Sequence, residues 1–172
     1  QEAVTYASQL AGGPVTAVTF GNAQGLESLG AQGAGKVIVA RGVSSVDGQQ
    51  LTKLVCDIAS KEGANTIVCV HDATGKSVAP RVAARLKAGH VAGAIGLPVD
   101  GKFKRNVFSG KAQAWMQVTS PVKVVSLMPN SIAIGNGTGT ATVEEYTGDT
   151  GAARITVKEV RKAGTGIPLP EA

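Results

Sequence analysis

Gly75, Lys76 and Ser77 follow the short β-branched stretch Thr66–Val70 and are the residues that most suggest phosphate binding. A P-loop ends in the same three residue types, because its backbone N–H groups and its lysine surround phosphate oxygens. That motif needs another glycine five positions before Gly75, where this sequence has Val70. What remains is a helix start, whose free N–H groups and partial positive charge can hold an anion or simply water.

His71 and Asp72 stand between this stretch and the helix. Parallel sheets bind ligands in the crevice beyond the carboxyl ends of their strands. We therefore take His71, Asp72 and residues 75–77 as candidate contacts for AMP or ATP. The sequence surrounds neither His71 nor His90 with a catalytic constellation, and a structural role is the favoured interpretation of both.

Cys56 and Cys69 are the two cysteines of the chain. Their spacing fits no metal motif, so we expect no metal site. Nothing in the sequence indicates secretion, so we expect free thiols in a reducing compartment. Cys69 falls in a strand predicted to be buried on both faces, whereas Cys56 falls off the apolar stripe of its helix.

Short β-branched runs alternate with amphipathic helices in the first half of the chain. The clearest helix is capped by Ser45 or Asp47, follows the i, i+3, i+4, i+7 rule and ends at Gly63. This order predicts an α/β fold, a doubly wound and mostly parallel sheet with helices on both faces. The predicted strands are residues 15–20, 36–40, 66–70 and 122–127, and the predicted helices are residues 1–11, 45–63 and 74–87. A helix before the first strand implies a further strand upstream.

The helix that follows Thr66–Val70 has its own signals. Thr74 or Ser77 is the predicted cap, which would put Pro80 in the first turn, where no donor is lost. Val78, Val82 and Leu86 form the apolar stripe expected to pack on the sheet, and Gly89 is the predicted stop.

After Gly89 the pattern becomes antiparallel. Asp100-Gly101 is a hairpin turn signal, and residues 112–118 alternate like a strand with one packed face. We expect a small antiparallel hairpin sheet around residues 95–119, covered by Trp115. Residues 130–151 are rich in Gly, Thr and Asn, and the nucleotide-like GNGTG within them (135–139) is predicted to be loop because no helix follows. Residues 153–160 predict a last strand.

The composition limits the classes of function. The net charge of +5 is scattered, without a polybasic run, and aromatic residues are few. Nucleic-acid binding is therefore disfavoured. No apolar stretch is long enough to span a membrane, and 172 residues suffice for one domain with a sizeable core.

Four segments, in this order and spacing, resemble the N-terminal domain of the alpha subunit of electron transfer flavoprotein. They are GKSVAPRVAARLKAG (75–89), FKRNVFSGKAQA (103–114), VKVVSLMPNSIAI (122–134) and VKEVRKAGTGIPLPEA (157–172). Three features depart from the family pattern. Met128-Pro129 replaces the usual Arg-Pro, and both the leading strand and the Ser-Gly-Gly-Arg-Gly opening of the flavin-binding domain are absent.

The resemblance implies a Rossmann-like, adenine nucleotide alpha hydrolase-like domain over residues 1–163, with its first strand upstream. Residues 164–172 would be a linker toward a flavin-binding domain. FAD would be bound mainly by that domain and its contact with the beta subunit, with no cofactor or catalytic residue on this segment. The whole protein would be an electron carrier of the bacterial cytoplasm or the mitochondrial matrix, taking electrons from flavin dehydrogenases such as acyl-CoA dehydrogenases.

Two alternatives remain beside this scaffold and subunit-interface function. One is a stand-alone AMP- or ATP-binding domain; the other, a hydrolase, has no supporting constellation. Arg81 and Arg85 are like charges four residues apart on one helix edge, and are either a solvated face or an interface with acidic groups of the flavin domain or beta subunit.

Overall fold

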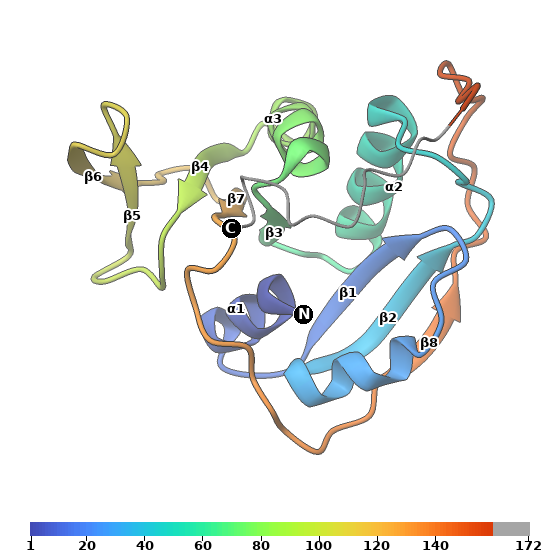
Figure 1. Cartoon of the computed structure of the whole chain (residues 1–172), viewed down its shortest axis with the longest axis horizontal. Helices are drawn as coiled ribbons and strands as arrows, with labels where there is room; N and C mark the ends of the chain where they lie inside the picture. The colour runs from blue at the N-terminus through green and yellow to red at the C-terminus, as the bar shows by residue number, and fades with distance from the viewer. Residues whose placement is uncertain (160–172) are drawn as a thin grey trace.

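Two β-sheets form the middle of the protein in a computed structural model that describes residues 1–159 (Figure 1). The first sheet has the order β1-β2-β8 and is parallel throughout. The second has the order β3-β7-β4-β5-β6, parallel from β3 to β4 and antiparallel from β4 to β6. The strands are β1 Val15–Phe20, β2 Ala34–Ala40, β3 Thr66–Val70, β4 Gly89–Ala94, β5 Lys102–Val107, β6 Ala112–Gln117, β7 Lys123–Leu127 and β8 Thr142–Glu145.

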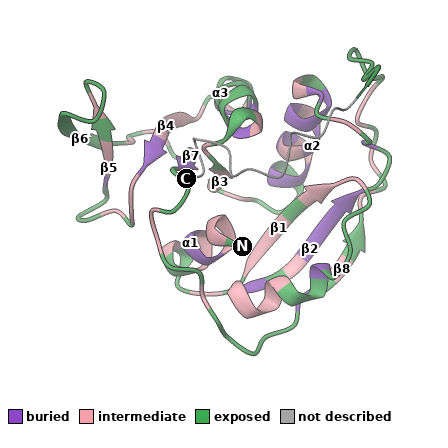
Figure 2. Ribbon diagram, in the orientation of Figure 1, coloured by how far each residue is buried: buried purple, intermediate pink, exposed green. Residues whose placement is uncertain are grey.

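Helices cover both faces of the sheets. Helices α2 (Gly48–Lys61) and α3 (Ala73–Leu86) pack with β2 and β7 in the largest core cluster. On the other face, α1 (Glu2–Ala11) places Tyr6 on the second sheet, and the 3-10 helix η1 (Leu26–Gln32) covers the first. Figure 2 shows buried residues on β2 and β4 and on parts of α2 and α3. The predicted α/β class, with mostly parallel strands and helices on both faces, is confirmed.

Helix α2 matches its prediction at both ends. Asp47 is the N-cap, and its carboxylate accepts hydrogen bonds from the backbone N–H groups of Gln49 and Gln50. The predicted stripe is largely buried, but so is Cys56, which the periodicity places outside it. Cys56 is buried because α3 packs on the flank of α2 and shares a core cluster with this residue.

Helix α3 begins earlier than predicted. Asp72 is its N-cap, not Thr74 or Ser77. Pro80 therefore lies inside the helix, where its missing N–H removes the hydrogen bond that residue 80 would give to the carbonyl of Lys76. The helix ends at Lys87, in left-handed conformation at φ 52°, and Gly89 begins β4 rather than ending the helix. Val78 and Val82 are buried and Leu86 is partly buried, as the stripe predicted.

Several strand predictions need correction. Strand β3 is half-buried rather than buried on both faces, because one of its edges has no neighbouring strand in the described residues. Strand β4 was not predicted, since its Gly- and Ala-rich sequence has little β propensity. Strand β8 follows the GNGTG loop and was not predicted, and residues 153–159 contain no strand. Residue 160 and the predicted linker 164–172 lie outside the described residues.

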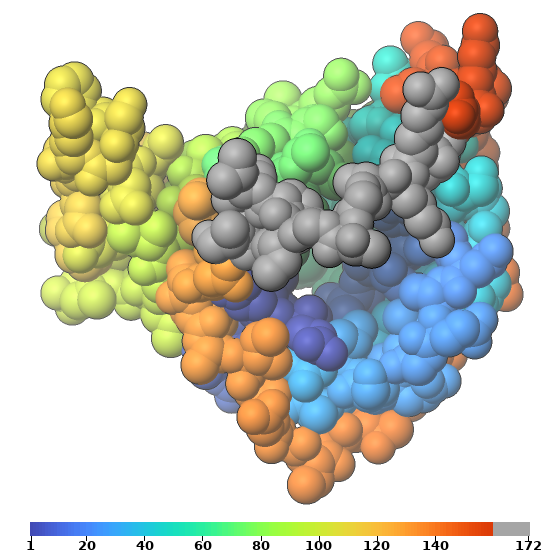
Figure 3. Space-filling model, viewed as in Figure 1, coloured from blue at the N-terminus to red at the C-terminus, as the bar shows by residue number. Residues whose placement is uncertain are grey.

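The predicted hairpin is present but forms no separate sheet. Asp100 and Gly101 both have positive φ, 51° and 72°, and turn the chain into β5. Strand β5 pairs with β4 and β6 pairs with β5, so the hairpin continues the second sheet. Its outer strand projects from the body of the molecule (Figure 3) and is almost wholly exposed, without the packed face expected for residues 112–118.

Candidate functional site

The start of α3 lies just beyond the carboxyl end of β3, as the anion-site hypothesis requires. Asp72, however, uses its own carboxylate to accept the backbone N–H of Gly75, at 2.7 Å. A Cβ on Gly75 would overlap the carbonyl oxygen of Val70. The close approach of α3 to β3 therefore explains why residue 75 is a glycine. The N–H of Gly75, one of the donors that an anion would need, is already bonded to Asp72.

Lys76 and Ser77 complete the incomplete P-loop pattern, and both are exposed. The hydroxyl of Ser77 donates to the carbonyl of Thr74, at 2.8 Å, which is a bond within the first turn of α3. The Lys76 ammonium is near enough to His71 to lower the pKa of its imidazole. The structure therefore brings all five candidate residues to one place, while the backbone and side-chain polar groups there are largely bonded to each other.

His71, just after β3, contacts Ser126 on the neighbouring strand β7. Its Nδ1 lies 2.8 Å from the Ser126 hydroxyl oxygen, which also accepts the backbone N–H of Gly93 at 3.1 Å. Burial first, then the charges of Lys76 and Arg105, lower the pKa of His71. A neutral imidazole at this position ties the ends of β3, β7 and β4 together. Ser126 was missed in the sequence, where a lone hydroxyl inside the apolar run 122–127 is its only signal.

His90 lies on β4 with its Nε2 buried and without a hydrogen-bond partner in the described part of the chain. Burial, then the nearby His71 and Arg105, lower its pKa. Nowhere in residues 1–159 do three or more His, Cys, Asp or Glu side chains gather as a metal ion would require. Both cysteines are free thiols, as expected; burial raises the pKa of Cys56, and burial and Asp72 raise that of Cys69 to about 11.

A groove of about 730 Å³ separates the two sheets. Its walls are the edges of β1 and β3, and α1 and α2 line it as well. Four apolar residues of α1 line this groove, namely Val4, Ala7, Leu10 and Ala11. Two of them also pack against core clusters, Leu10 on the second sheet and Val4 on the first. At one end lie Asp72, Thr74 and Gly75, so the groove runs to the candidate anion site.

The strand edges that face the groove are unpaired. In the described residues β1 pairs only with β2, and β3 pairs only with β7. Unpaired edges present rows of N–H and C=O groups that accept another strand. The groove thus combines apolar walls with backbone donors and acceptors, which is the surface that an extended peptide segment would complete.

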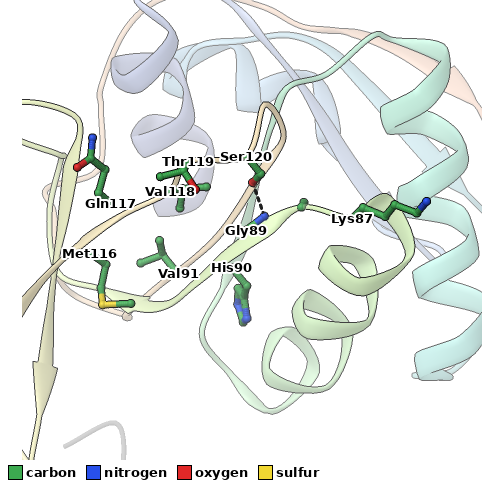
Figure 4. Close-up of a pocket in the computed structure, with 10 residues that line it drawn as sticks. Lys87, Gly89, His90, Val91, Met116, Gln117, Val118, Thr119 and Ser120 are labelled. Atoms are coloured by element: carbon green, nitrogen blue, oxygen red, sulfur yellow. Dashed lines mark hydrogen bonds between the residues drawn. The ribbon is translucent and has the colours of Figure 1, made fainter.

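A second cavity, of about 390 Å³, opens beside the amino end of β4 (Figure 4). It is lined by residues 87–91 and 116–120, and the hydroxyl of Ser120 accepts the backbone N–H of Gly89 across it, at 2.7 Å. Ligands of parallel sheets bind at the carboxyl ends of the strands, so this cavity lies at the opposite edge from the expected crevice.

The Electron transfer flavoprotein domain family matches residues 1–150, which include every helix and strand described above. The chain belongs to the electron transfer flavoprotein family. It is 28% identical over 182 aligned residues to the electron transfer flavoprotein subunit alpha of Bacillus subtilis, covering 99% of this chain and 56% of that protein. It is 29% identical to the subunit alpha of Pseudomonas aeruginosa, covering 77% of this chain and 44% of that protein. The chain thus spans about half the length of these relatives.

In this electron transfer flavoprotein chain, Arg81 and Arg85 form an exposed edge of α3 that leans toward α2. The Arg81 guanidinium lies near Gly48, and Arg85 is close enough to Cys56 to influence its pKa. We call this edge the arginine ridge. Among residues 1–159, neither side chain lies within 4.0 Å of a carboxylate oxygen.

The segment that follows β8 runs along the outside of α2. Tyr146 donates to the Asp57 carboxylate at 2.7 Å, and Lys53 forms an ion pair with Asp149 at 2.6 Å. The Gln50 side chain donates to the carbonyl of Gly151. These contacts hold residues 146–151 against α2 after the last strand of the first sheet. No helix in residues 1–159 has the length and apolar character to cross a membrane.

Proposed function

We propose that this chain is the N-terminal scaffold and subunit-interface domain of an electron transfer flavoprotein alpha subunit. The observation that carries the proposal is the family match over residues 1–150, together with two relatives that are both named subunit alpha. In the proposed heterodimer, electrons pass from flavin dehydrogenases of the acyl-CoA dehydrogenase type to a respiratory acceptor. The protein is then an electron carrier, and the flavin supplies the redox chemistry when bound.

FAD would be bound mainly by a flavin-binding domain that follows this α/β domain. Two observations support this assignment. The chain spans about half of each relative, and the polar groups at the carboxyl end of β3 are largely bonded to each other. The groove that reaches this end of β3 is lined mainly by apolar side chains. It therefore offers few polar groups to the ring and phosphates of a flavin nucleotide.

The same proposal covers the domain organisation. Residues 1–163 would be one α/β domain, and residues 164–172 would lead to the flavin-binding domain. A strand upstream of Gln1 would enter the groove, pair with β1 and β3 and join the two sheets into one. Consecutive strands joined by a crossover helix usually lie side by side, so a strand that precedes α1 and β1 is expected beside β1, where the groove lies.

Two measurements test the proposal. Titration of the purified chain with FAD, followed by visible absorbance, is expected to show no stoichiometric tight binding; a yellow one-to-one complex would contradict it. The chain mixed with the beta subunit from the same organism is expected to elute as a heterodimer in size-exclusion chromatography. A thermal shift with AMP or ATP, but none with the beta subunit, would favour the stand-alone nucleotide-binding alternative.

The arginine ridge offers a sharper form of the second measurement. If the ridge meets acidic groups of the beta subunit, Arg81→Glu with Arg85→Glu raises the dissociation constant of the heterodimer about tenfold. Arg41→Glu with Lys158→Glu is the matched control, because both residues are exposed and the change in net charge is the same. Equal affinity in both double variants would leave the ridge as a solvated face.

A further inference from the structure

The carboxylate of Glu2, in the first turn of α1, is bound by three consecutive residues of the loop that follows β7. Its Oε1 accepts the backbone N–H groups of Ser131, at 2.8 Å, and Ile132, at 3.1 Å, and its Oε2 accepts that of Asn130, at 3.0 Å. We call residues 130–132 the carboxylate loop. It runs beside α1 (Figure 1), although Asn130 follows Glu2 by 128 positions in the sequence.

The carboxylate loop is shaped by contacts that do not involve Glu2. Asn130 has a φ of 61°, and a left-handed residue in a loop can turn successive backbone N–H groups toward one point. The hydroxyl of Ser131 donates to the carbonyl of Met128 at 2.6 Å, and Ile132 packs against the core of the second sheet. The three donors should therefore keep their arrangement when the Glu2 side chain is removed.

Backbone N–H groups compensate the charge of the Glu2 carboxylate. In residues 1–159 no Lys, Arg or His nitrogen lies within 4.0 Å of its oxygens, and the residue is half-buried. Hydrogen bonds from N–H groups to an ionised carboxylate are about twice as strong as neutral ones. The dipole of α1 also favours an acid in its first turn, but that attraction needs no bond to the loop. It does not account for three N–H groups aimed at two oxygens.

The same face of α1 contacts the crossover segment a second time. The hydroxyl oxygen of Thr5, one turn after Glu2, accepts the backbone N–H of Gly135 at 3.0 Å, and Thr5 is buried. Residues three apart lie on one face of a helix, so the crossover segment holds α1 along this face. Other residues of α1 line the groove between the sheets. The position of α1 beside the groove thus depends on these contacts.

We propose that the carboxylate loop is a binding site for a carboxylate, that Glu2 fills it as an internal ligand, and that the filled site latches the start of α1. When Glu2 is removed, the same three donors bind a small external carboxylate such as acetate. Two acceptor oxygens facing three donors suit a planar carboxylate, whereas a phosphate would present further oxygens that need donors of their own. The site and the latch are independent of the proposed function, since all their contacts lie within this chain.

The first test is chemical rescue of the full chain carrying Glu2→Ala. In sodium chloride its melting temperature, followed by circular dichroism, is expected to lie at least about 4 °C below that of the wild type. Sodium acetate at equal ionic strength is expected to restore at least about half of that loss. Glu27→Ala is the matched control, because Glu27 is also an acid in the first turn of a helical segment but is exposed and forms no ion pair in residues 1–159. Acetate should change the wild type and this control by less than about 1 °C, which also measures the general effect of the salt.

The second test locates the bound acetate by NMR. In Glu2→Ala labelled with 15N, the backbone amide signals of residues 130–132 are expected to shift and saturate as acetate is added. The same titration of the wild type should leave them unmoved, because the Glu2 carboxylate already occupies the site. If Glu2→Ala is unfolded in chloride, acetate is expected to restore its circular dichroism, and a chain that stays unfolded would refute the site.

The outcomes separate the site from the latch. Equal shifts in the wild type and Glu2→Ala, or no saturable shift at residues 130–132 in the variant, would overturn the binding site. A melting temperature of Glu2→Ala equal to that of Glu27→Ala would overturn the latch. Sodium phosphate that saturates the same signals at a concentration at least about tenfold lower than acetate would overturn the carboxylate as the class of ligand.

Discussion

The carboxylate of Asp47 binds the start of α2 and the backbone of Arg154 at the same time. Its Oδ1 accepts the N–H of Gln49 at 2.8 Å, and its Oδ2 accepts the N–H of Arg154 at 2.8 Å, from a residue 107 positions later in the chain. The side chain is 1% exposed. Asp47 therefore acts both as a helix cap and as the anchor of the segment that follows β8.

This anchoring predicts an acid-sensitive fold. Hydrogen bonds from Arg154, then from Gln49, lower the pKa of Asp47. A carboxyl whose pKa is lower in the folded state stabilises the fold above its unfolded pKa, near 4, and that stability is lost as pH falls through the folded value. We expect the melting temperature, followed by circular dichroism, to fall below about pH 4, and to fall less steeply in Asp47→Asn. Identical slopes in both proteins would contradict this role.

Gly75 is predicted to be a packing residue. In Gly75→Ala the new Cβ would overlap the carbonyl of Val70, so α3 must move away from β3. We expect the free energy of unfolding in urea to fall by about 1–3 kcal/mol, the usual cost of overpacking. Gly42→Ala is the control, because nothing lies within 4 Å of its added Cβ, and a change below about 0.5 kcal/mol is expected there. A neutral Gly75→Ala would require another reason for this glycine.

The sequence predicted the elements with strong periodicity and missed those without it. Helix α2 and strands β1, β2, β3 and β7 follow apolar patterns that tertiary packing reinforces. Strands β4 and β8 contain glycine, threonine and charged residues, and exist because neighbouring strands offer them backbone partners.

The candidate site was partly predictable for the same reason. His71, Asp72 and Gly75 come together because they are adjacent in sequence. Ser126, 55 residues from His71, comes near only through the pairing of β3 with β7, which no local pattern encodes. The start of α3 was misplaced because three possible caps stand within six residues, and the sequence does not show which of them bonds to a backbone N–H.

Both tyrosines are predicted to ionise at a higher pH than an ordinary tyrosine. Burial raises the pKa of Tyr6 to about 12, and burial with the hydrogen bond to Asp57 raises that of Tyr146 to about 12. Because they are the whole tyrosine content, phenolate absorbance of the folded protein should stay low at pH 10 and rise toward pH 12. Their stabilising effect is complete below pH 10 and is lost over the same interval, since the unfolded phenols ionise first.

Tyr146→Phe separates the two contributions. It should halve the amplitude of the late transition and lower stability by about 1 kcal/mol, the usual value of one hydrogen bond. If half of the phenolate signal appears at pH 10 in the folded wild type, the pKa of one of the two tyrosines is not raised.

Because the groove has two unpaired strand edges, an added strand is expected to stabilise the fold. An extension of about six alternating valine and threonine residues before Gln1 should pair with β1 and β3 and raise the melting temperature by at least about 5 °C. It should also slow the reaction of Cys69, which lines the groove, with a thiol reagent. A glycine-serine extension of equal length is the control. Equal melting temperatures and thiol rates for the two extensions would argue against a strand in the groove.

The late position of β8 bears on synthesis at the ribosome. Val37 of β2 pairs with Val143 of β8, so this edge of β2 has no partner strand until residue 143, 106 positions later, has been translated. During that interval a buried, β-branched strand is open to pairing with other nascent chains. Chains released before residue 145 emerges are therefore expected to aggregate through the open edge of β2.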